Sequence, residues 1–285
     1  MSNSGKVKVG IIGSQFEADI HAASFKIASE HAELAAVASP TPGNAAALAK
    51  GYGIPRVFTD YREMIKERDL EMITIAAPNA LHAQMTADCA RAGKHVVCEK
   101  PLAMTIEEAE QMIHDTRKAG VLLLYAEELF FTPKYLKAKE MADDGAFGKI
   151  HVVKQSEKHF GPHAAWFWDV NRCGGGALMD LGCHGIAFCY WFLGRPRDSV
   201  CLLSDGHLCS LLTRPRAKMK LTTFWNSRVV HSALLRTSGG QRGEMDDNRS
   251  LRCGRLSMLE QWADELVFQF AAAFIRCAYE NGDPL

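Results

Sequence analysis

Six short apolar segments alternate with helix-like segments over the first 125 residues, and this alternation constrains the fold more than any other feature. The apolar segments cover 6–12, 34–38, 57–58, 70–76, 95–98 and 121–125. The helix-like segments between them cover 18–30, 44–52, 60–66, 79–93 and 105–118, the last opened by the capping-box spacing Thr105-Ile-Glu-Glu108. Short apolar strands that alternate with helices are typical of parallel sheets covered on both faces. The sequence therefore predicts an α/β fold with a doubly wound parallel sheet.

The first strand leads into a turn that nearly matches the dinucleotide fingerprint G-x-G-x-x-G/A. The turn reads Gly13-Ser14-Gln15-Phe16-Glu17-Ala18. Gly13 would make the tight turn and Ala18 would let the helix pack closely on the strand, but Gln15 replaces the glycine that admits a pyrophosphate. The order of strand, turn and helix predicts a Rossmann dinucleotide site with Gly13, Ser14, Gln15 and Phe16 at the phosphates. A turn without a ligand is the alternative.

The second strand ends in Ser39-Pro40-Thr41, where an acidic residue normally binds the ribose of NAD. Ser39 and Thr41 have hydroxyl groups that can bind a sugar or a 2′-phosphate, but no arginine stands beside them. The sequence therefore predicts NAD or NADP as cofactor without distinguishing the two.

The fourth strand is followed by Ala77, Pro78, Asn79 and then His82. A small residue and a proline leave room for a flat ring against the backbone, so these positions are predicted to contact the cofactor. Asn79 also suits the N-cap of the next helix, and the cap is the more conservative interpretation.

The fifth strand ends in Glu99-Lys100-Pro101. Ligands of open α/β sheets bind at the carboxyl ends of the strands, which is where Lys100 would lie. Proline has no amide donor and disfavours a helical conformation for the residue before it. A strand end with a solvated charge pair is the alternative interpretation.

The second half of the chain contains Gly174-Gly-Gly-Ala-Leu-Met-Asp180-Leu-Gly-Cys-His184. Asp180 and His184 are four residues apart, so on one helix they would project from the same face. Histidine suits acid/base chemistry near neutral pH, and a neighbouring carboxylate would orient it. The alternative is a core histidine on the apolar helix over 186–193.

Taken together, these motifs resemble the Gfo/Idh/MocA family of glucose–fructose oxidoreductase and inositol dehydrogenase. The resemblance covers about residues 6–196. The matching residues are Val9-Gly-Ile-Ile-Gly13 with His21, Ala76-Ala-Pro-Asn79 with His82, Cys98-Glu-Lys-Pro-Leu102, and the segment from Gly174 to His184.

The resemblance implies a nicotinamide-dependent oxidoreductase that acts on a sugar, inositol or related polyol. In the family pattern, Lys100 touches the cofactor side and the reacting hydroxyl, and Glu99 faces the nicotinamide ribose. The Lys100-Pro101 bond matches the family's cis peptide, a conformation accessible before proline. Asp180 and His184 match the substrate-binding and proton-transfer positions.

Several residues are predicted on the substrate side. Glu128 stands where relatives often carry asparagine, and Phe130 where they carry the arginine that would grip an anion, so a neutral polyol is favoured. Aromatic rings stack on sugar rings and polar groups bind hydroxyls, which points to His163, Trp166, Trp168 and Asp169. A loop packed over the sheet with buried indoles is an equally good interpretation.

We expect two domains, a Rossmann domain over 1–125 and an α+β domain over 126–285. The resemblance implies that the second has an open, largely antiparallel sheet that floors the active site and through which copies associate. Strands are predicted over 149–154, 200–203 and 218–225. Residues 242–255 have no apolar period and are predicted to form a loop or to be disordered, whereas 258–279 has a helical apolar stripe. The second domain is therefore expected to be divergent and shortened after about residue 200.

Composition excludes some classes of function. Lys plus Arg and Asp plus Glu number 33 each, which points away from nucleic acid and anionic membranes as partners. The 9 cysteines form no Cys-x-x-Cys pair, so we expect reduced core thiols and no metal site. No signal-peptide pattern precedes the first strand, and a cytoplasmic location is expected.

The leading prediction is thus an NAD(P)-dependent sugar or polyol dehydrogenase. Lys100 would polarise or deprotonate the reacting hydroxyl, with His184 as acid/base partner and Asp180 orienting it. The alternative is a non-catalytic protein of the same family that binds or senses the dinucleotide, which Gln15 and the divergent region motivate.

Overall fold

The computed structural model describes two compact units, each with its own sheet. The described residues are 5–156, 164–194, 199–204 and 208–213. Among them, 5–128 and 164–176 form the first unit, and 129–156, 177–194, 199–204 and 208–213 form the second. The strand predicted over 218–225, the loop over 242–255 and the helix over 258–279 lie outside the described residues.

The first unit contains a parallel sheet of six strands in the order β3-β2-β1-β4-β5-β6. The strands are β1 (Val7–Ile12), β2 (Ala32–Ala38), β3 (Arg56–Phe58), β4 (Met72–Ile75), β5 (His95–Glu99) and β6 (Leu123–Ala126). Every neighbouring pair is parallel. This order confirms the predicted doubly wound sheet, and it reverses direction between β1 and β4.

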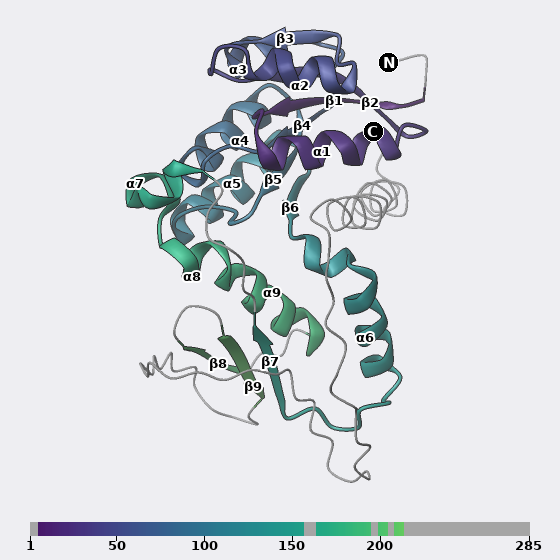
Figure 1. Ribbon diagram of the computed structural model, residues 1–285, viewed down its shortest axis with the longest axis vertical. Helices are drawn as coiled ribbons and strands as arrows, with labels where there is room; N and C mark the ends of the chain where they lie inside the picture. Colours follow the sequence, from purple (N-terminus) through teal and green to yellow (C-terminus); the bar gives the residue numbers. More distant parts are fainter. Residues whose placement is uncertain (1–4, 157–163, 195–198, 205–207, 214–285) are drawn as a thin grey trace, which may run out of the picture. The chain divides into compact units, whose positions relative to one another are not determined.

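Helices cross over between consecutive strands and cover both faces of this sheet (Figure 1). They are α1 (Phe16–Ile27), α2 (Asn44–Tyr52), α3 (Tyr61–Met64), α4 (His82–Arg91) with the short 3-10 helix η1 (Asn79–Leu81) before it, and α5 (Ile106–Ala119). Alternate residues of β1 face different cores. Ile11 packs with α1 and α2, whereas Ile12 packs with α3, α4 and α5. The strands are apolar on both sides for this reason.

The predicted capping box forms at the start of α5. Thr105 Oγ1 accepts a hydrogen bond of 3.1 Å from the Glu108 amide, and Glu108 Oε2 accepts one of 3.0 Å from the Met104 amide. Gly120, with φ of +69°, ends the helix in the left-handed conformation. Both ends of α5 are therefore set by local sequence.

A further segment of the first unit comes from later in the chain. It consists of the 3-10 helix η3 (Ala165–Trp168) and the short helix α7 (Val170–Cys173). The Asn79 amide at the end of β4 donates a hydrogen bond of 2.8 Å to the Cys173 carbonyl. This segment thus packs with the parallel sheet although it follows the first strand of the second unit in sequence.

The second unit has an antiparallel sheet in the order β7-β9-β8, as expected for this half of the chain. Its strands are β7 (Val152–Ser156), β8 (Ser199–Ser204) and β9 (Leu208–Thr213), and its longer helices are α6 (Pro133–Asp143) and α9 (Gly182–Phe192). Val153 packs with Leu129, Phe188, Cys189 and Phe192 in its core. The sequence did not predict β9, because its run Leu-Cys-Ser-Leu-Leu-Thr does not alternate polar and apolar residues.

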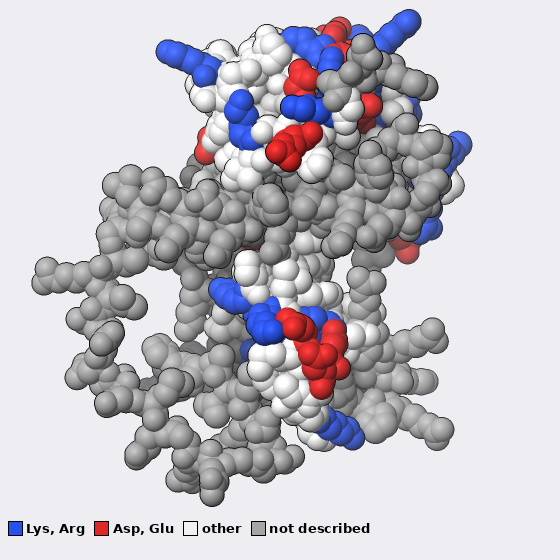
Figure 2. Space-filling view, turned by 90° about the vertical axis from the view of Figure 1, so that its right-hand side faces the viewer, with Lys and Arg blue, Asp and Glu red and all other residues white. Residues whose placement is uncertain are grey.

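The described surface carries both signs of charge. Lysine or arginine and acidic side chains are interspersed over the described part of the face in Figure 2, as the balanced composition predicts. Five cysteines are free thiols, of which Cys183 is half-buried and the others, Cys89, Cys98, Cys173 and Cys189, are buried. None of the described helices is long and apolar enough to span a membrane.

Gly13 lies directly after β1, close to the backbone of Ala76 directly after β4. Its φ is +123°, and a Cβ at this position would lie 2.2 Å from the Ala76 carbonyl oxygen. That distance is far below any van der Waals contact, and the oxygen belongs to the backbone and cannot move aside. A side chain at residue 13 would therefore force the ends of β1 and β4 apart.

We predict that Gly13→Ala lowers the free energy of unfolding by on the order of 2–4 kcal/mol, because strain and a backbone clash add. Urea unfolding followed by circular dichroism measures the loss. Gly43→Ala is the matched control, since Gly43 has φ of +79° but a Cβ at that position would meet nothing within 4 Å. The control should lose only about 1 kcal/mol, and equal losses in the two variants would contradict the role of the close approach.

Candidate functional site

The carboxyl ends of β1 and β4 mark the point where the strand order of the first unit reverses. The chain leaves β1 toward β2 on one side and leaves β4 toward β5 on the other. Ligands of open α/β sheets bind in the crevice that such a reversal creates. The residues predicted for a dinucleotide site lie in four loops at the carboxyl ends of the strands, those after β1, β2, β4 and β5.

The loop after β1 presents the start of α1 without a side-chain cap. Gln15 occupies the N-cap position with φ of −113° and ψ of −154°, and its side chain makes no capping hydrogen bond. The amides in the first turn of a helix, together with the helix dipole, favour an anion. Because any residue adopts these backbone angles, glycine at position 15 would be needed only for the approach of a ligand. Gln15 and Phe16 are both exposed.

The loop after β2 is held by hydroxyl groups. Ser14 Oγ donates to Ser39 Oγ at 2.8 Å, and the Thr41 amide donates to the same oxygen at 3.4 Å. Ser39 is buried and Thr41 is exposed. The Ser39 oxygen already accepts twice, so it is available to a ribose or phosphate only as a donor. The hydroxyl groups of Ser39 and Thr41 do not distinguish NAD from NADP.

The loop after β4 differs from the prediction at Asn79. Ala77 and Pro78 are half-buried there, as a contact surface for a ring requires. Asn79 is buried, and its side-chain amide donates to the Cys173 carbonyl. Leu81 occupies the N-cap position of α4 without a side-chain cap. The predicted cap is therefore wrong, because a tertiary partner takes the amide that a local helix end would use.

His82 is fully buried, and both of its ring nitrogens face backbone carbonyls. Nδ1 lies 2.9 Å from the Pro101 oxygen and Nε2 lies 2.8 Å from the Ala77 oxygen. His82 thus joins the loops after β4 and β5. If it contributes to the cofactor site as predicted, it does so by positioning the backbone of these loops.

The loop after β5 contains the predicted catalytic lysine. The Lys100-Pro101 peptide is cis, as the family resemblance implied. Lys100 is half-buried, and its amide donates to Glu99 Oε2 at 2.9 Å. The other carboxylate oxygen of Glu99, Oε1, lies 2.8 Å from Nε2 of His21 on α1. This turn is therefore fixed by contacts with α1 and with His82.

Burial and pairing act in opposite directions on His21 and Glu99, which are 6% and 8% exposed. Burial lowers the pKa of His21, but the hydrogen bond and charge of Glu99 outweigh it and raise the pKa above its usual 6.5. Burial raises the pKa of Glu99, but His21 outweighs it and holds the pKa below its usual 4.5. The two groups thus favour the charged pair over a wide range of pH.

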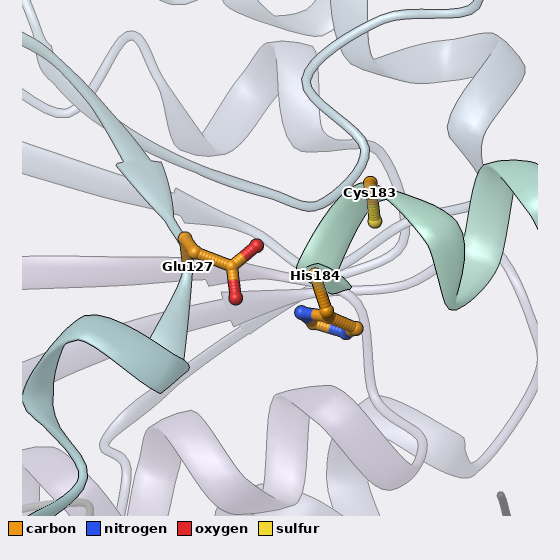
Figure 3. Close-up of side chains that lie close together, drawn as sticks. All are labelled: Glu127, Cys183 and His184. Carbon is orange, nitrogen blue, oxygen red and sulfur yellow. The ribbon is translucent and has the colours of Figure 1, made fainter. Parts of the chain in front are cut away.

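The second unit carries Asp180 and His184 on two consecutive helices rather than on one. Asp180 is the last residue of α8 (Gly176–Asp180), and His184 lies in the first turn of α9. Leu181 separates the helices, and Gly182 follows it, a residue that weakens helices. The condition for a shared face, one uninterrupted helix, is therefore not met. His184 is buried and Asp180 is half-buried. Figure 3 shows His184 beside Cys183 on α9, and Glu127 where the chain leaves β6.

The predicted substrate residues differ in accessibility. Glu128 is half-buried at the start of the 3-10 helix η2 (Glu128–Phe131). Trp166 is half-buried and its ring stacks on that of Phe167, with centroids 3.9 Å apart. Trp168 is 80% exposed, which contradicts the interpretation of buried indoles for this residue. Asp169 caps α7 by accepting from the Asn171 amide at 3.0 Å. His163 lies outside the described residues.

Comparison with known families matches both halves of the chain. Residues 7–127 match the family described as "Oxidoreductase family, NAD-binding Rossmann fold", and residues 135–255 match the GFO/IDH/MocA C-terminal domain. The chain belongs to the Gfo/Idh/MocA family. The fold and the matched motifs agree with this assignment, which confirms the resemblance seen in the sequence.

Relatives within the family include dehydrogenases of sugars and inositol. D-glucoside 3-dehydrogenase of Escherichia coli is 32% identical over 195 residues, which cover 68% of this chain and 56% of that protein. Myo-inositol 2-dehydrogenase of Thermotoga maritima is 26% identical over 200 residues, which cover 70% and 58%. The chain therefore spans a little over half the length of these relatives.

Solved structures show the same similarity. Aldose-aldose oxidoreductase from Caulobacter crescentus, complexed with glycerol, has a TM-score of 0.62 at 32% identity and covers 69% of this chain and 59% of that one. Levoglucosan dehydrogenase in complex with NADH has a TM-score of 0.62 at 27% identity, with coverage of 70% and 57%.

His21 belongs to the motif that resembles the family, but the sequence alone assigned it no role. The signal that identifies it is its position on the apolar face of α1, beside Ala18, Ala22 and Phe25 in helical spacing, all of which are buried. A buried polar group on such a face requires a partner. The identity of that partner, Glu99, is 78 residues away in the chain and is not visible locally.

We predict that Glu99→Gln lowers stability most in mildly acidic solution. A lowered carboxyl pKa stabilises the fold above the unfolded value of about 4.5, and a raised histidine pKa stabilises it below about 6.5. The loss should therefore be largest between these values, on the order of 2 kcal/mol, and shrink as the pH rises through the folded pKa of His21. Urea unfolding from pH 5 to 9 measures it.

Glu33→Gln is the control for this experiment, because Glu33 is an exposed carboxylate on β2 of the same unit. Its effect should be small at every pH. A loss in Glu99→Gln that does not change between pH 5 and 9 would show that the pair does not titrate as its geometry indicates.

Proposed function

We propose that this protein is an NAD(P)-dependent oxidoreductase that transfers hydride between the nicotinamide and a sugar, inositol or related polyol. The observation that carries the proposal is the half-buried Lys100 at the carboxyl end of β5, whose amide is held by the buried carboxylate of Glu99. The Lys100 turn follows β5, and the start of α1, which has no side-chain cap, follows β1. Both strands belong to the same parallel sheet. The printed names of the relatives, a glucoside, an inositol and a levoglucosan dehydrogenase, support the substrate class.

The first unit would hold the dinucleotide. Gly13, Ser14, Gln15 and Phe16 would lie at the pyrophosphate, where the amides of α1 can bind it, and Ser39 and Thr41 at the adenosine ribose. Ala77, Pro78, Asn79, His82 and Glu99 would form or support the nicotinamide site. The close approach of Gly13 to the Ala76 carbonyl fits this assignment, because it keeps the turn compact beside β4. When bound, the nicotinamide accepts or returns the hydride.

The protein's own residues would manage the proton and the developing charge. Loss of the hydroxyl proton leaves negative charge on the oxygen of the alcohol. Lys100 would stabilise that charge in its cationic form, or would accept the hydroxyl proton in its neutral form. His184 would accept or return the proton as acid/base partner, with Asp180 orienting it. Glu128, His163, Trp166, Trp168 and Asp169 would contact the hydroxyls and rings of the substrate.

A second candidate function is a non-catalytic member of the family that binds or senses the dinucleotide. The specific observation in its favour is Gln15 at the position of the middle glycine, where its side chain stands at the start of α1. Tight binding of dinucleotide without turnover of any polyol would favour this function. A cytoplasmic location and association of copies through the sheet of the second unit stay predictions.

We predict that Lys100→Ala lowers kcat by at least about 10²-fold, because it removes the cation beside the reacting oxygen. The Kd for dinucleotide should stay within a few-fold of that of the wild-type protein. Steady-state assays with a panel of polyols and aldoses measure the first, and titration with NADH and NADPH measures the second.

Lys118→Ala is the control, because Lys118 lies in the last turn of α5, away from the carboxyl ends of the strands. It should retain turnover. If Lys100→Ala lost dinucleotide binding to the same extent as turnover, the lysine would be a cofactor ligand and its proposed chemical role would be wrong.

A further inference from the structure

His21 lies on α1, outside the turn after β5 that contains Lys100, but it is placed to act on that turn. It lies in the second turn of α1 and is 6% exposed, with buried apolar residues on the same helical face. Its Nε2 is 2.8 Å from Glu99 Oε1. A buried imidazole among apolar residues needs hydrogen-bonding partners, and Glu99 is one of them.

The two oxygens of Glu99 have separate partners, and this makes the carboxylate a link. Oε1 meets His21, and Oε2 accepts the amide of Lys100 at 2.9 Å. The next residue, Pro101, has no amide hydrogen, so the strand ladder cannot continue past Lys100. The main chain of Lys100 therefore depends on the orientation of the Glu99 carboxylate, and that orientation depends on His21.

We propose that His21 is a positioning residue that fixes the main chain of Lys100 through the carboxylate of Glu99. It joins α1, whose start would hold the pyrophosphate, to the turn that carries the lysine. The catalytic consequence rests on the proposed function, whereas the structural link does not.

The charges around His21 favour its donor role. Three carboxylates act on the imidazole, those of Glu99, Glu17 and Glu128, and all of them favour its protonated form. Glu17 is on α1 itself, Glu99 is at the end of β5 and Glu128 follows β6. A charge-assisted hydrogen bond is stronger than a neutral one, which suits a contact that must hold a carboxylate still.

The experiment compares three variants of the full chain. His21→Leu removes the donor, whereas His21→Gln keeps an N–H donor at nearly the same distance from the backbone. His114→Asn is the control, because His114 is an exposed histidine on α5 of the same unit. Amide hydrogen exchange without added dinucleotide, read by mass spectrometry on peptides that cover 96–102, reports on the Lys100 amide independently of activity.

We expect His21→Leu to speed exchange of the Lys100 amide by about tenfold, because one hydrogen bond that holds its acceptor is lost. His21→Gln should recover most of the protection, and His114→Asn should match the wild-type protein. In assays with substrate, His21→Leu should lower kcat by about 10- to 100-fold, as misplacement of a reacting group does. The Kd for dinucleotide should change by only a few-fold, and His21→Gln should restore kcat in part.

Unchanged exchange at Lys100 in His21→Leu would overturn the proposal. So would faster exchange spread equally over α1 and the whole sheet, because that pattern indicates general destabilisation. If the wild-type protein turns over no polyol, the proposed function fails, and the exchange comparison still decides the link. If the wild-type protein is active and His21→Leu keeps its kcat, the proposed function stands and the positioning role is wrong.

Discussion

Burial of the parallel strands on both faces is the constraint on which the first unit depends. Helices cover each side of the sheet, so residues along β1, β4 and β5 meet apolar partners in both directions. Polar chemistry cannot be placed within such strands without the cost of desolvation. It is confined to the strand ends, where the backbone ladder stops and loops begin. The glycine turn, the Ala77–Pro78 loop and the Lys100 turn all lie at these ends.

The strand ends contain buried polar groups that are paired with one another. Glu99 would be costly at 8% exposure without compensation, but it accepts hydrogen bonds from the Lys100 amide and from His21. His82 is fully buried between the Pro101 and Ala77 carbonyls. The contact between His21 and Glu99 joins α1 to the turn after β5, and His82 joins the loops after β4 and β5. The lysine turn is therefore a product of several long-range contacts, and its geometry does not follow from the Glu-Lys-Pro sequence alone.

Membership of the Gfo/Idh/MocA family rests on both halves of the chain, but the two halves differ in how they depart from the expected pattern. In the first half the departures are single residues. Gln15 has an ordinary backbone conformation and would affect only a bound ligand, and Ser39 stands where an acidic residue normally binds the ribose. In the second half the departures concern the chain path. Asp180 and His184 lie on two consecutive helices, α8 and α9, that meet at Leu181.

The sequence by itself determined the sheet, its flanking helices and the order of its loops, because periodicity and local caps act over a few residues. The α2 bounds, the Thr105 cap and the position of Lys100 at a strand end all follow from such short-range signals. Tertiary structure alone decided which partners the polar residues take. Asn79 binds the Cys173 carbonyl instead of capping its own helix, and His21 meets a carboxylate 78 residues away. Burial requires these groups to find partners, and only the folded chain determines which partners are within reach.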